Sequence, residues 1–182
     1  MLICQLTDLH LRPRGMASNR VSETNMLCDR AFRRVSQLRP APDVVIITGD
    51  LTEVGNPAEY ATLARLLKTH LSMPVFVIPG NHDRRENLRA GLAVASADPD
   101  RIHYAIDDFL VRIVMLDTVV PGASHGELAA EQLDWLDRTL AGAPDKPTLI
   151  GMHHPPFGCG IAHMDGIALR EPERPQPRAG RE

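Results

Sequence analysis

The chain has 182 residues, of which 43% are hydrophobic, and a formal net charge of −3 at pH 7. This length and composition fit a single globular domain and do not indicate a disordered chain. The slight acidic excess argues against a nucleic-acid polymer as a partner, since such a partner calls for a basic excess or patch. No apolar stretch approaches the roughly 20 residues of a membrane-spanning helix, and no signal-peptide pattern precedes the first strand. We therefore expect a cytoplasmic protein with no membrane partner.

Strand and helix patterns alternate along the chain, which is typical of the α/β class. A strand-like apolar run begins at Leu2. We expect Ser22 to cap a helix that runs to about Leu38 and ends before Pro40 and Pro42. The predicted apolar face of this helix consists of Met26, Leu27, Ala31, Val35 and Leu38.

The second strand lies in the sequence DVVIITGD and is apolar on both faces, as expected of a central strand covered by helices or by a second sheet. Asn56 and Pro57 predict an N-cap followed by proline at the first helical position. The helix that they start is expected to end before Pro74, which opens a third strand in PVFVIPGNHD.

The segment RIHYAIDDFLVRIVMLDT predicts two strands joined by a turn at Asp107 and Asp108. An amphipathic helix is expected from Glu127 to Leu140, and a further strand from Thr148 to Met152. The character of the sequence then changes at Arg170. The last 13 residues hold three prolines and seven charged residues. We expect a domain of residues 1–169 and a disordered or loosely attached tail of residues 170–182.

The three cysteines are widely separated and form no C-x-x-C pair, and their odd number argues against a disulfide framework. Cys4 lies in a strand pattern and Cys28 in a helical pattern, so both are expected to be small buried hydrophobic residues. Cys159 follows a His-His-Pro-Pro segment, where it could be a metal ligand, but an ordinary loop residue is the stronger interpretation.

Four of the strand-like runs end in side chains that bind hard divalent metals. These are Asp8 and His10 after the first run, Asp50 after the second, Asn81, His82 and Asp83 after the third, and His153 and His154 after the fourth. Four such ends in series indicate strands that converge on one metal centre. Mixed oxygen and nitrogen donors suit Mn²⁺, Fe and Zn²⁺ better than Ca²⁺ or Mg²⁺.

Each motif has a weaker interpretation when it is taken alone. Asp8 and His10 would lie on the same side of an extended segment and could share an ion, but such tripeptides also occur in solvated turns. The two oxygens of Asp50 could bridge two ions, although Gly-Asp is a common turn sequence. The pair of histidines at 153 and 154 could be a strand end with one core histidine. Gly-Asn-His-Asp is more specific, because three polar groups directly follow an apolar strand.

In this order the motifs resemble those of the calcineurin-like metallophosphoesterases. The resemblance covers residues 1–169 and rests on Asp8-Leu9-His10, Gly49-Asp50, Gly80-Asn81-His82-Asp83 and His153-His154-Pro155. Within this superfamily the chain is most similar to the bacterial class III cyclic-nucleotide phosphodiesterases and glycerophosphodiesterases. The Ser/Thr protein phosphatases are disfavoured, because LTEVG stands where they carry Asp-Arg-Gly. The resemblance implies an αββα sandwich of two sheets flanked by helices.

The resemblance also implies two divalent ions, Mn²⁺, Fe²⁺ or Fe³⁺, or Zn²⁺. One would be held by Asp8, His10 and Asp50, and the other by Asp50, Asn81 and His153. Two ions about 3.5–4 Å apart clamp phosphoryl oxygens and generate a hydroxide nucleophile for in-line attack.

Three further residues have implied roles near these ligands. His82 would stabilise the charged oxygens or protonate the leaving alkoxide. Asp83 would orient His82 or cap the following helix. His154 is expected beside the ligands or the substrate, because His153 already fills the family's His-x-Pro pattern.

The family's fifth motif, Gly-His-x-His, does not occur after residue 155. Two histidine ligands and the C-terminal strands of the sandwich would then be lacking. His163 could replace a lost ligand, but a loop histidine that faces the substrate pocket or solvent is the stronger interpretation. Affinity for metal should be lower with three protein ligands at each site, a number that suffices in zinc enzymes.

We therefore expect a metal-dependent phosphoric diester hydrolase whose activity is weak or absent in the 182-residue form. Its substrate would be a small phosphodiester, either a 3',5'-cyclic nucleotide such as cyclic AMP or a glycerophosphodiester. The alternative is a truncated member of the same superfamily that binds metal or nucleotide without turnover. The sequence leaves open the identity of the diester and of the metal, and whether the protein forms a homo-oligomer.

Overall fold

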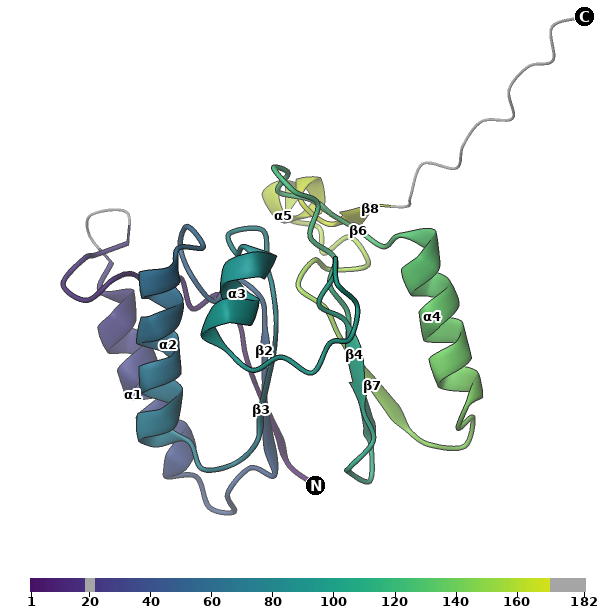
Figure 1. Ribbon diagram of the computed structural model, residues 1–182, viewed down its shortest axis with the longest axis horizontal. Helices are drawn as coiled ribbons and strands as arrows, with labels where there is room; N and C mark the ends of the chain where they lie inside the picture. Colours follow the sequence, from purple (N-terminus) through teal and green to yellow (C-terminus); the bar gives the residue numbers. More distant parts are fainter. Residues whose placement is uncertain (19–21, 171–182) are drawn as a thin grey trace, which may run out of the picture.

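The structure is a computed structural model that describes residues 1–18 and 22–170. Its centre is a pair of three-stranded sheets that lie face to face (Figure 1). The first sheet is entirely parallel and has the strand order β1-β2-β3. Its strands are β1 (Ile3–Leu6), β2 (Val44–Thr48) and β3 (Val75–Ile78).

The second sheet has the order β4-β5-β7, with β4 antiparallel to β5 and β5 parallel to β7. Its strands are β4 (Tyr104–Ile106), β5 (Arg112–Met115) and β7 (Thr148–Gly151). A small parallel pair, β6 (Gly126–Glu127) and β8 (Leu169–Arg170), lies beyond one end of this sheet (Figure 1). The turn predicted at Asp107 and Asp108 joins β4 to β5, as expected.

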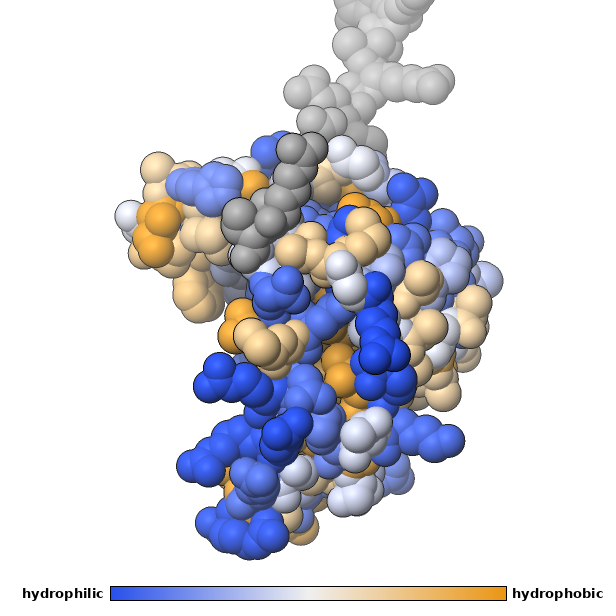
Figure 2. All heavy atoms as spheres, turned by 90° about the vertical axis from the view of Figure 1, so that its left-hand side faces the viewer, coloured by the Kyte–Doolittle hydropathy of each residue, from blue (hydrophilic) through white to orange (hydrophobic). Residues whose placement is uncertain are grey.

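Helices cover the outer faces of both sheets. The first sheet is flanked by α1 (Thr24–Ser36) and α2 (Pro57–His70), with α3 (Arg85–Gly91) beside α2, and the second sheet by α4 (Ala130–Ala141). The short helix α5 (Ala162–Gly166) lies near β6 and β8 (Figure 1). The layers run helix, sheet, sheet, helix, so the predicted αββα sandwich is confirmed. Hydrophilic side chains predominate on the face formed by α1 and α2 (Figure 2).

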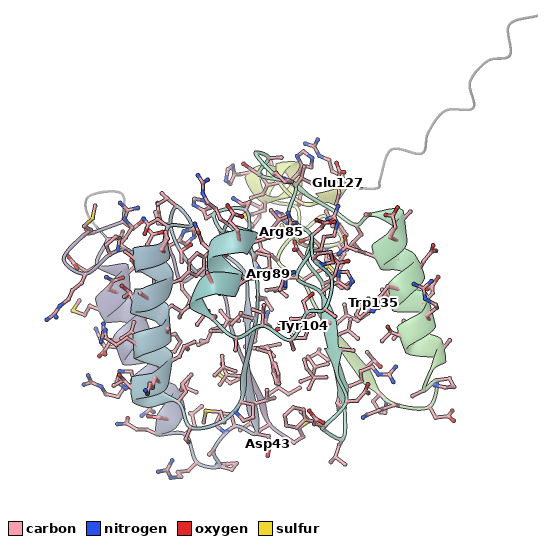
Figure 3. The ribbon with its side chains drawn as sticks, viewed as in Figure 1. Asp43, Arg85, Arg89, Tyr104, Glu127 and Trp135 are labelled. Atoms are coloured by element: carbon pink, nitrogen blue, oxygen red, sulfur yellow. The ribbon has the colours of Figure 1, made fainter. Side chains whose placement is uncertain are left out.

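The core lies between the two sheets and under the helices. All five residues of β2 are buried, as expected for a central strand. Tyr104 extends from β4 toward the first sheet (Figure 3), where its hydroxyl donates to the carbonyl of Val77 at 2.7 Å and accepts from the Val77 N–H at 2.9 Å. Trp135 extends from α4 toward the second sheet and packs with Val114 and Leu116. Burial of each such large apolar side chain contributes about 1.5–3 kcal/mol.

The prediction for α1 was wrong in its start and, apart from the buried Val35, in much of its apolar face. Ser22 forms a bridge with Ser18, and the helix begins at Thr24 without a side-chain N-cap. The residues that face the core are Cys28, Phe32 and Val35, whereas Met26 and Leu27 are exposed. The buried set has the i, i+4, i+7 spacing of one helical stripe, and packing against the sheet selects that stripe.

The predicted start of α2 is confirmed, whereas the predicted start of α4 is wrong. Asn56 accepts a hydrogen bond from the N–H of Glu59, whose side chain accepts from the N–H of Asn56, so the predicted cap is confirmed as a capping box. Such a cap contributes about 1 kcal/mol. The helix expected from Glu127 begins instead at Ala130, because Glu127 belongs to β6 and pairs with β8.

The predicted tail falls almost wholly outside the described residues. Its first residue, Arg170, is the last residue of β8, and residues 171–182 are not described. Among the described helices, none combines the length and the apolar character that crossing a membrane requires.

The three cysteines differ in their surroundings, and we expect this to appear in their reactivity. Cys28 is buried, and burial raises its pKa to about 11. The pKa of the half-buried Cys4 is also raised by burial. Cys159 is exposed. A thiol-specific chromogenic reagent at about pH 8 should therefore titrate one cysteine rapidly in the native protein and three after denaturation, since thiolate is the reactive form. Rapid reaction of Cys28 would contradict its burial.

Candidate metal centre

The predicted ligands lie at one end of the sandwich. The strands β1, β2 and β3 are parallel, so their carboxyl ends meet at the same edge of the first sheet. The carboxyl end of β7 brings the fourth motif to the same place from the second sheet, and His153 contacts the carbonyl of Thr48 through Nδ1 at 2.9 Å. The site is therefore built from both halves of the sandwich.

Three of the predicted ligands have left-handed backbone conformations. Asp8, His10 and Asp50 have φ values of 56°, 45° and 48°, and no other non-glycine residue in the described part of the chain has a positive φ. Such a conformation costs about 1–3 kcal/mol per residue and often occurs at functional sites. The N–H of Asp8 donates to the carbonyl of Gly49 at 3.1 Å, and that of His10 to the carbonyl of Asp50 at 3.0 Å. These bonds hold the two loops together and maintain the strain.

Asp8 and His10 do not lie on a strand, so the prediction that they share one side of an extended segment is wrong. The strand β1 ends at Leu6, so the two side chains do not alternate along an extended segment. They point to one centre because the chain turns through left-handed conformations beyond the strand.

Glycines provide the space for two of the ligands. A β-carbon on Gly49, whose φ is 99°, would lie 2.4 Å from Nδ1 of His153. A β-carbon on Gly80 would lie 2.2 Å from Oδ1 of Asp50. Each glycine in the Gly-Asp and Gly-Asn-His-Asp motifs is thus required for a ligand side chain of a neighbouring segment to approach.

Asp50 is the centre of the arrangement. Its Oδ2 lies 3.5 Å from Nε2 of His10, and its Oδ1 lies 3.5 Å from Nε2 of His153. Nε2 of His10 is also 3.8 Å from Oδ1 of Asp8, and Nε2 of His153 is 3.2 Å from Oδ1 of Asn81. The five predicted ligands are therefore adjacent, and the two oxygens of Asp50 face different histidines.

Two overlapping groups of donor atoms are compact enough for metal ions. One group contains His10, Asp50 and His82, and the other contains Asp8, Asp50 and His153. Both share Asp50, as the sequence suggested, but His82 joins the first group and Asp8 the second. Asn81 adds an amide oxygen beside His153.

The donor set fits divalent metal. Asp50 is buried, yet neither it nor Asp8 forms a salt bridge with lysine or arginine among the described residues. A buried carboxylate needs a compensating positive charge. Ligands about 2.0–2.2 Å from one ion lie roughly 3.0–3.5 Å from each other, which is close to the observed donor separations. A divalent cation would supply the missing charge.

Asp8 and His10 affect each other's proton affinity. The interaction with His10 lowers the pKa of Asp8, and the same interaction raises the pKa of His10. The adjacent His154 behaves differently, because burial lowers its pKa to about 4. This ring is therefore neutral near neutral pH.

His82 is placed between Asp50 and a surface cavity. Its main-chain N–H donates to Oδ1 of Asp50 at 2.9 Å, and its ring Nε2 lies 4.0 Å from Oδ2 of the same carboxylate. Its Nδ1 contacts the carbonyl of Glu53 at 2.7 Å. The cavity has a volume of 510 Å³. It is lined by Glu53, Val54, Asn81, His82, Asp83, Arg84, Arg85, Glu86, Val119, Pro121 and Gly122.

The contacts of Asp83 match neither of its predicted roles, which were to orient His82 or to cap the following helix. Nδ1 of His82 is oriented by the Glu53 carbonyl rather than by Asp83, and α3 has no side-chain cap. Asp83 is instead buried and accepts five hydrogen bonds. The donors are the N–H groups of Leu51, Thr52 and Gly80 and the hydroxyls of Thr52 and Tyr60. Burial raises the pKa of Asp83, and these donors oppose that effect.

The remaining candidates lie outside the donor groups. Nδ1 of His154 contacts the Thr118 hydroxyl at 2.6 Å, and the ring packs against Gly126. His163 is exposed on α5 and belongs to neither group in the part of the chain that is described. Cys159 is also exposed, in the loop before α5.

Two polar contacts near the site were missed from the sequence. Glu53 lies beside His10, and its only sequence signal is its position three residues after Asp50. Arg85 makes a two-pronged interaction with the buried carboxylate of Asp117, at 2.6 and 2.8 Å. The Arg85 side chain extends from α3 toward the second sheet (Figure 3), and this pair fixes one wall of the cavity. No local sequence pattern predicts an ion pair between residues that are 32 positions apart.

A two-sheet sandwich with carboxylate, amide and imidazole donors at its strand ends defines the metallophosphoesterase class. Comparison with known proteins gives the same result and names the family. Residues 1–178 match the family model described as calcineurin-like phosphoesterase. The chain belongs to this family, whose members bind a dinuclear metal centre.

Individual relatives are phosphodiesterases by name. A probable glycerophosphodiester phosphodiesterase of Arcobacter nitrofigilis is 39% identical over 168 residues, covering 91% of this chain and 61% of that protein. A 3',5'-cyclic adenosine monophosphate phosphodiesterase of Pseudomonas aeruginosa is 33% identical over 173 residues, covering 95% of this chain and 62% of that protein. The chain thus spans less than two thirds of the length of these relatives.

The fold is also found in a solved structure. A purple acid phosphatase from yellow lupin superposes with a TM-score of 0.59 at 14% identity, covering 86% of this chain and 30% of that one. This similarity supports the sandwich architecture.

Proposed function

We propose that this chain is a metal-dependent phosphodiesterase that hydrolyses a small phosphodiester. The observation that carries the proposal is the position of Asp50, whose two carboxylate oxygens lie 3.5 Å from the Nε2 atoms of two different histidines. One carboxylate can therefore serve two ions. The phosphodiesterase names of the relatives support the reaction class.

The residues would divide the two ions as the family motifs imply. Asp8, His10 and Asp50 would hold one ion, and Asp50, Asn81 and His153 the other. When bound, a pair of Mn²⁺, Fe or Zn²⁺ ions supplies an activated hydroxide and neutralises phosphoryl oxygens. The strained loops and the interloop hydrogen bonds keep the donors in place before any ligand arrives.

His82 is the group that we assign to the leaving oxygen. Its Nδ1 donates to the Glu53 carbonyl, which leaves Nε2 directed toward Asp50 and the cavity. The protonated ring can donate the Nε2 proton to the departing alkoxide while Nδ1 keeps its partner. Asp83 would act only by holding the loops.

The cavity beside His82 would receive the leaving group. Its described lining contains no Phe, Tyr or Trp on which a nucleobase could stack, and most of it is polar or charged: Glu53, Asn81, His82, Asp83, Arg84, Arg85 and Glu86. Hydroxylated or zwitterionic groups suit such a lining. We therefore favour a glycerophosphodiester over a 3',5'-cyclic nucleotide as substrate.

A second function is metal or nucleotide binding without turnover. It is favoured by one feature of the donor set, in which each ion would have three protein ligands with Asp50 counted twice. Three ligands with water suffice for catalytic zinc in other enzymes, so the donor count leaves room for catalysis.

The two functions are separated by an assay of the purified chain with bis(p-nitrophenyl) phosphate after loading with Mn²⁺, Fe²⁺ or Zn²⁺. We expect slow turnover that requires metal and is lost with a chelator. The monoester p-nitrophenyl phosphate should be a poorer substrate, and glycerophosphoethanolamine should be hydrolysed faster than cyclic AMP. Stoichiometric metal binding with no turnover at any loading would establish the second function instead.

A further inference from the structure

Glu53 contacts both histidines that face Oδ2 of Asp50, but through different atoms. Its side-chain Oε2 lies 3.2 Å from Nδ1 of His10, while its main-chain carbonyl lies 2.7 Å from Nδ1 of His82. The two imidazole rings meet edge to face with centroids 4.7 Å apart. One residue therefore adjoins the outward nitrogen of each ring.

The Glu53 carboxylate is itself held in position. The buried Ser18 hydroxyl donates to Oε2 at 2.8 Å, and the Glu53 N–H donates to the carbonyl of Leu11 at 3.1 Å. The side chain is only 15% exposed. Within the described residues, His10 is its only salt-bridge partner, so its charge is not engaged by lysine or arginine.

The surroundings of His10 need such a partner. Its Nδ1 atom is buried and has no hydrogen-bond partner among the described residues, and the acidic group that faces it is the Glu53 carboxylate, 3.2 Å away. A carboxylate on Nδ1 favours the tautomer that is protonated there. Carboxylates of Asp50 and Asp8 also face Nε2, but at 3.5 and 3.8 Å they lie farther from the ring than Glu53 does, so we expect the proton on Nδ1. The lone pair of Nε2 is then available at the place where a metal ion would bind. Carboxylates behind ligating histidines orient the ring and increase its basicity.

We propose that Glu53 is a positioning residue that fixes the ligand tautomer of His10 through its side chain. The inference rests on the proposed function, since it gives Nε2 of His10 a metal to bind. His82 obtains the same orientation from the main chain of Glu53. Substitution of Glu53 should therefore affect His10 and leave the tautomer of His82 unchanged.

The tautomers can be read directly in metal-free protein. Long-range ¹H–¹⁵N NMR spectra at about pH 8, with the His10 signals assigned from a His10→Gln variant, should show His10 protonated on Nδ1 in the unmodified chain. In Glu53→Ala the His10 signals should shift toward the Nε2-protonated form that free imidazole prefers in water. Glu53→Gln should keep the Nδ1 form, because an amide oxygen can still accept the proton. The His82 signals provide an internal control.

Titration with Mn²⁺ gives the second measurement. Loss of a group behind a ligating histidine typically weakens metal binding 10–100-fold, and we expect that range for Glu53→Ala and a smaller loss for Glu53→Gln. Glu131→Ala is the matched control, because it removes the same charge from an exposed position on α4, outside both the cavity lining and the donor groups. Its metal affinity should remain close to that of the unmodified chain.

Two results would overturn the inference: an unchanged His10 tautomer in Glu53→Ala, or equal loss of metal affinity in Glu53→Ala and Glu131→Ala. Failure of the proposed function would look different. In that case the unmodified chain would hydrolyse no phosphodiester, while the tautomer measurement on metal-free protein would still decide the role of Glu53.

Discussion

Asp50→Asn is expected to reduce metal-dependent phosphodiesterase activity at least about 100-fold, since loss of groups merely behind a ligand already costs metal sites 10–100-fold. The amide has one oxygen where the carboxylate has two. Its oxygen would remain where Oδ1 accepts the N–H of His82 at 2.9 Å, because that bond needs an acceptor. The amide nitrogen would then face Nε2 of His10, from which Oδ2 is 3.5 Å away. The ion nearest His10 loses a ligand.

The measurement pairs steady-state turnover of bis(p-nitrophenyl) phosphate with calorimetric Mn²⁺ titration. We expect the number of ions bound to fall from two to one or fewer, with little change in the melting temperature. Asp108→Asn makes the same chemical change at an exposed position and should leave both quantities unaltered. Two ions bound by Asp50→Asn with unmodified affinity would rule out a bridging role for Asp50.

The sequence predicted the location of the site better than its geometry. Metal-binding side chains after apolar runs indicate strand ends, and parallel strands place such ends at one edge. Asp8, His10, Asp50, Asn81 and His153 are indeed adjacent in the structure. Which of them share an ion remains a prediction.

The local backbone could not be predicted from these patterns. Asp8 and His10 look like alternate residues of a strand, but their positive φ values depend on hydrogen bonds to the loop after β2. The prediction of the apolar face of α1 was inaccurate for a related reason. Several stripes of that helix are partly apolar, and only packing against the sheet selects Cys28, Phe32 and Val35. Tertiary contacts decide both cases.

The role of Asp83 also depends on tertiary contacts that the sequence does not predict. Within Gly-Asn-His-Asp it looks like a partner for the neighbouring His82, but its hydrogen-bond donors come from the loop after β2, from α2 and from Gly80. No periodicity in the sequence relates Asp83 to Leu51 or Tyr60. Its function as a link between loops appears only in the folded chain.

Asp83→Asn is expected to lower the free energy of unfolding by about 2–4 kcal/mol, because an amide placed among five donors leaves buried groups unpaired. For a chain of this size the melting temperature should fall by roughly 4–16 °C. Tyr60→Phe removes one of the donors to Asp83 and also the acceptor of the Arg84 N–H, and should cost about 1–2 kcal/mol. Thermal unfolding followed by circular dichroism measures both changes, with the exposed Asp108→Asn as a control.

The same substitution distinguishes a structural role of Asp83 from a catalytic one. Its acceptor oxygens hold the N–H groups of Leu51 and Gly80, which adjoin the ligands Asp50 and Asn81. Loosening these loops should weaken Mn²⁺ binding in parallel with the loss of stability. A group that only served proton transfer would, when replaced, lower turnover while the melting temperature and metal affinity stayed constant. We expect the first pattern, since every hydrogen bond of the Asp83 side chain in the described structure goes to the scaffold and none to His82.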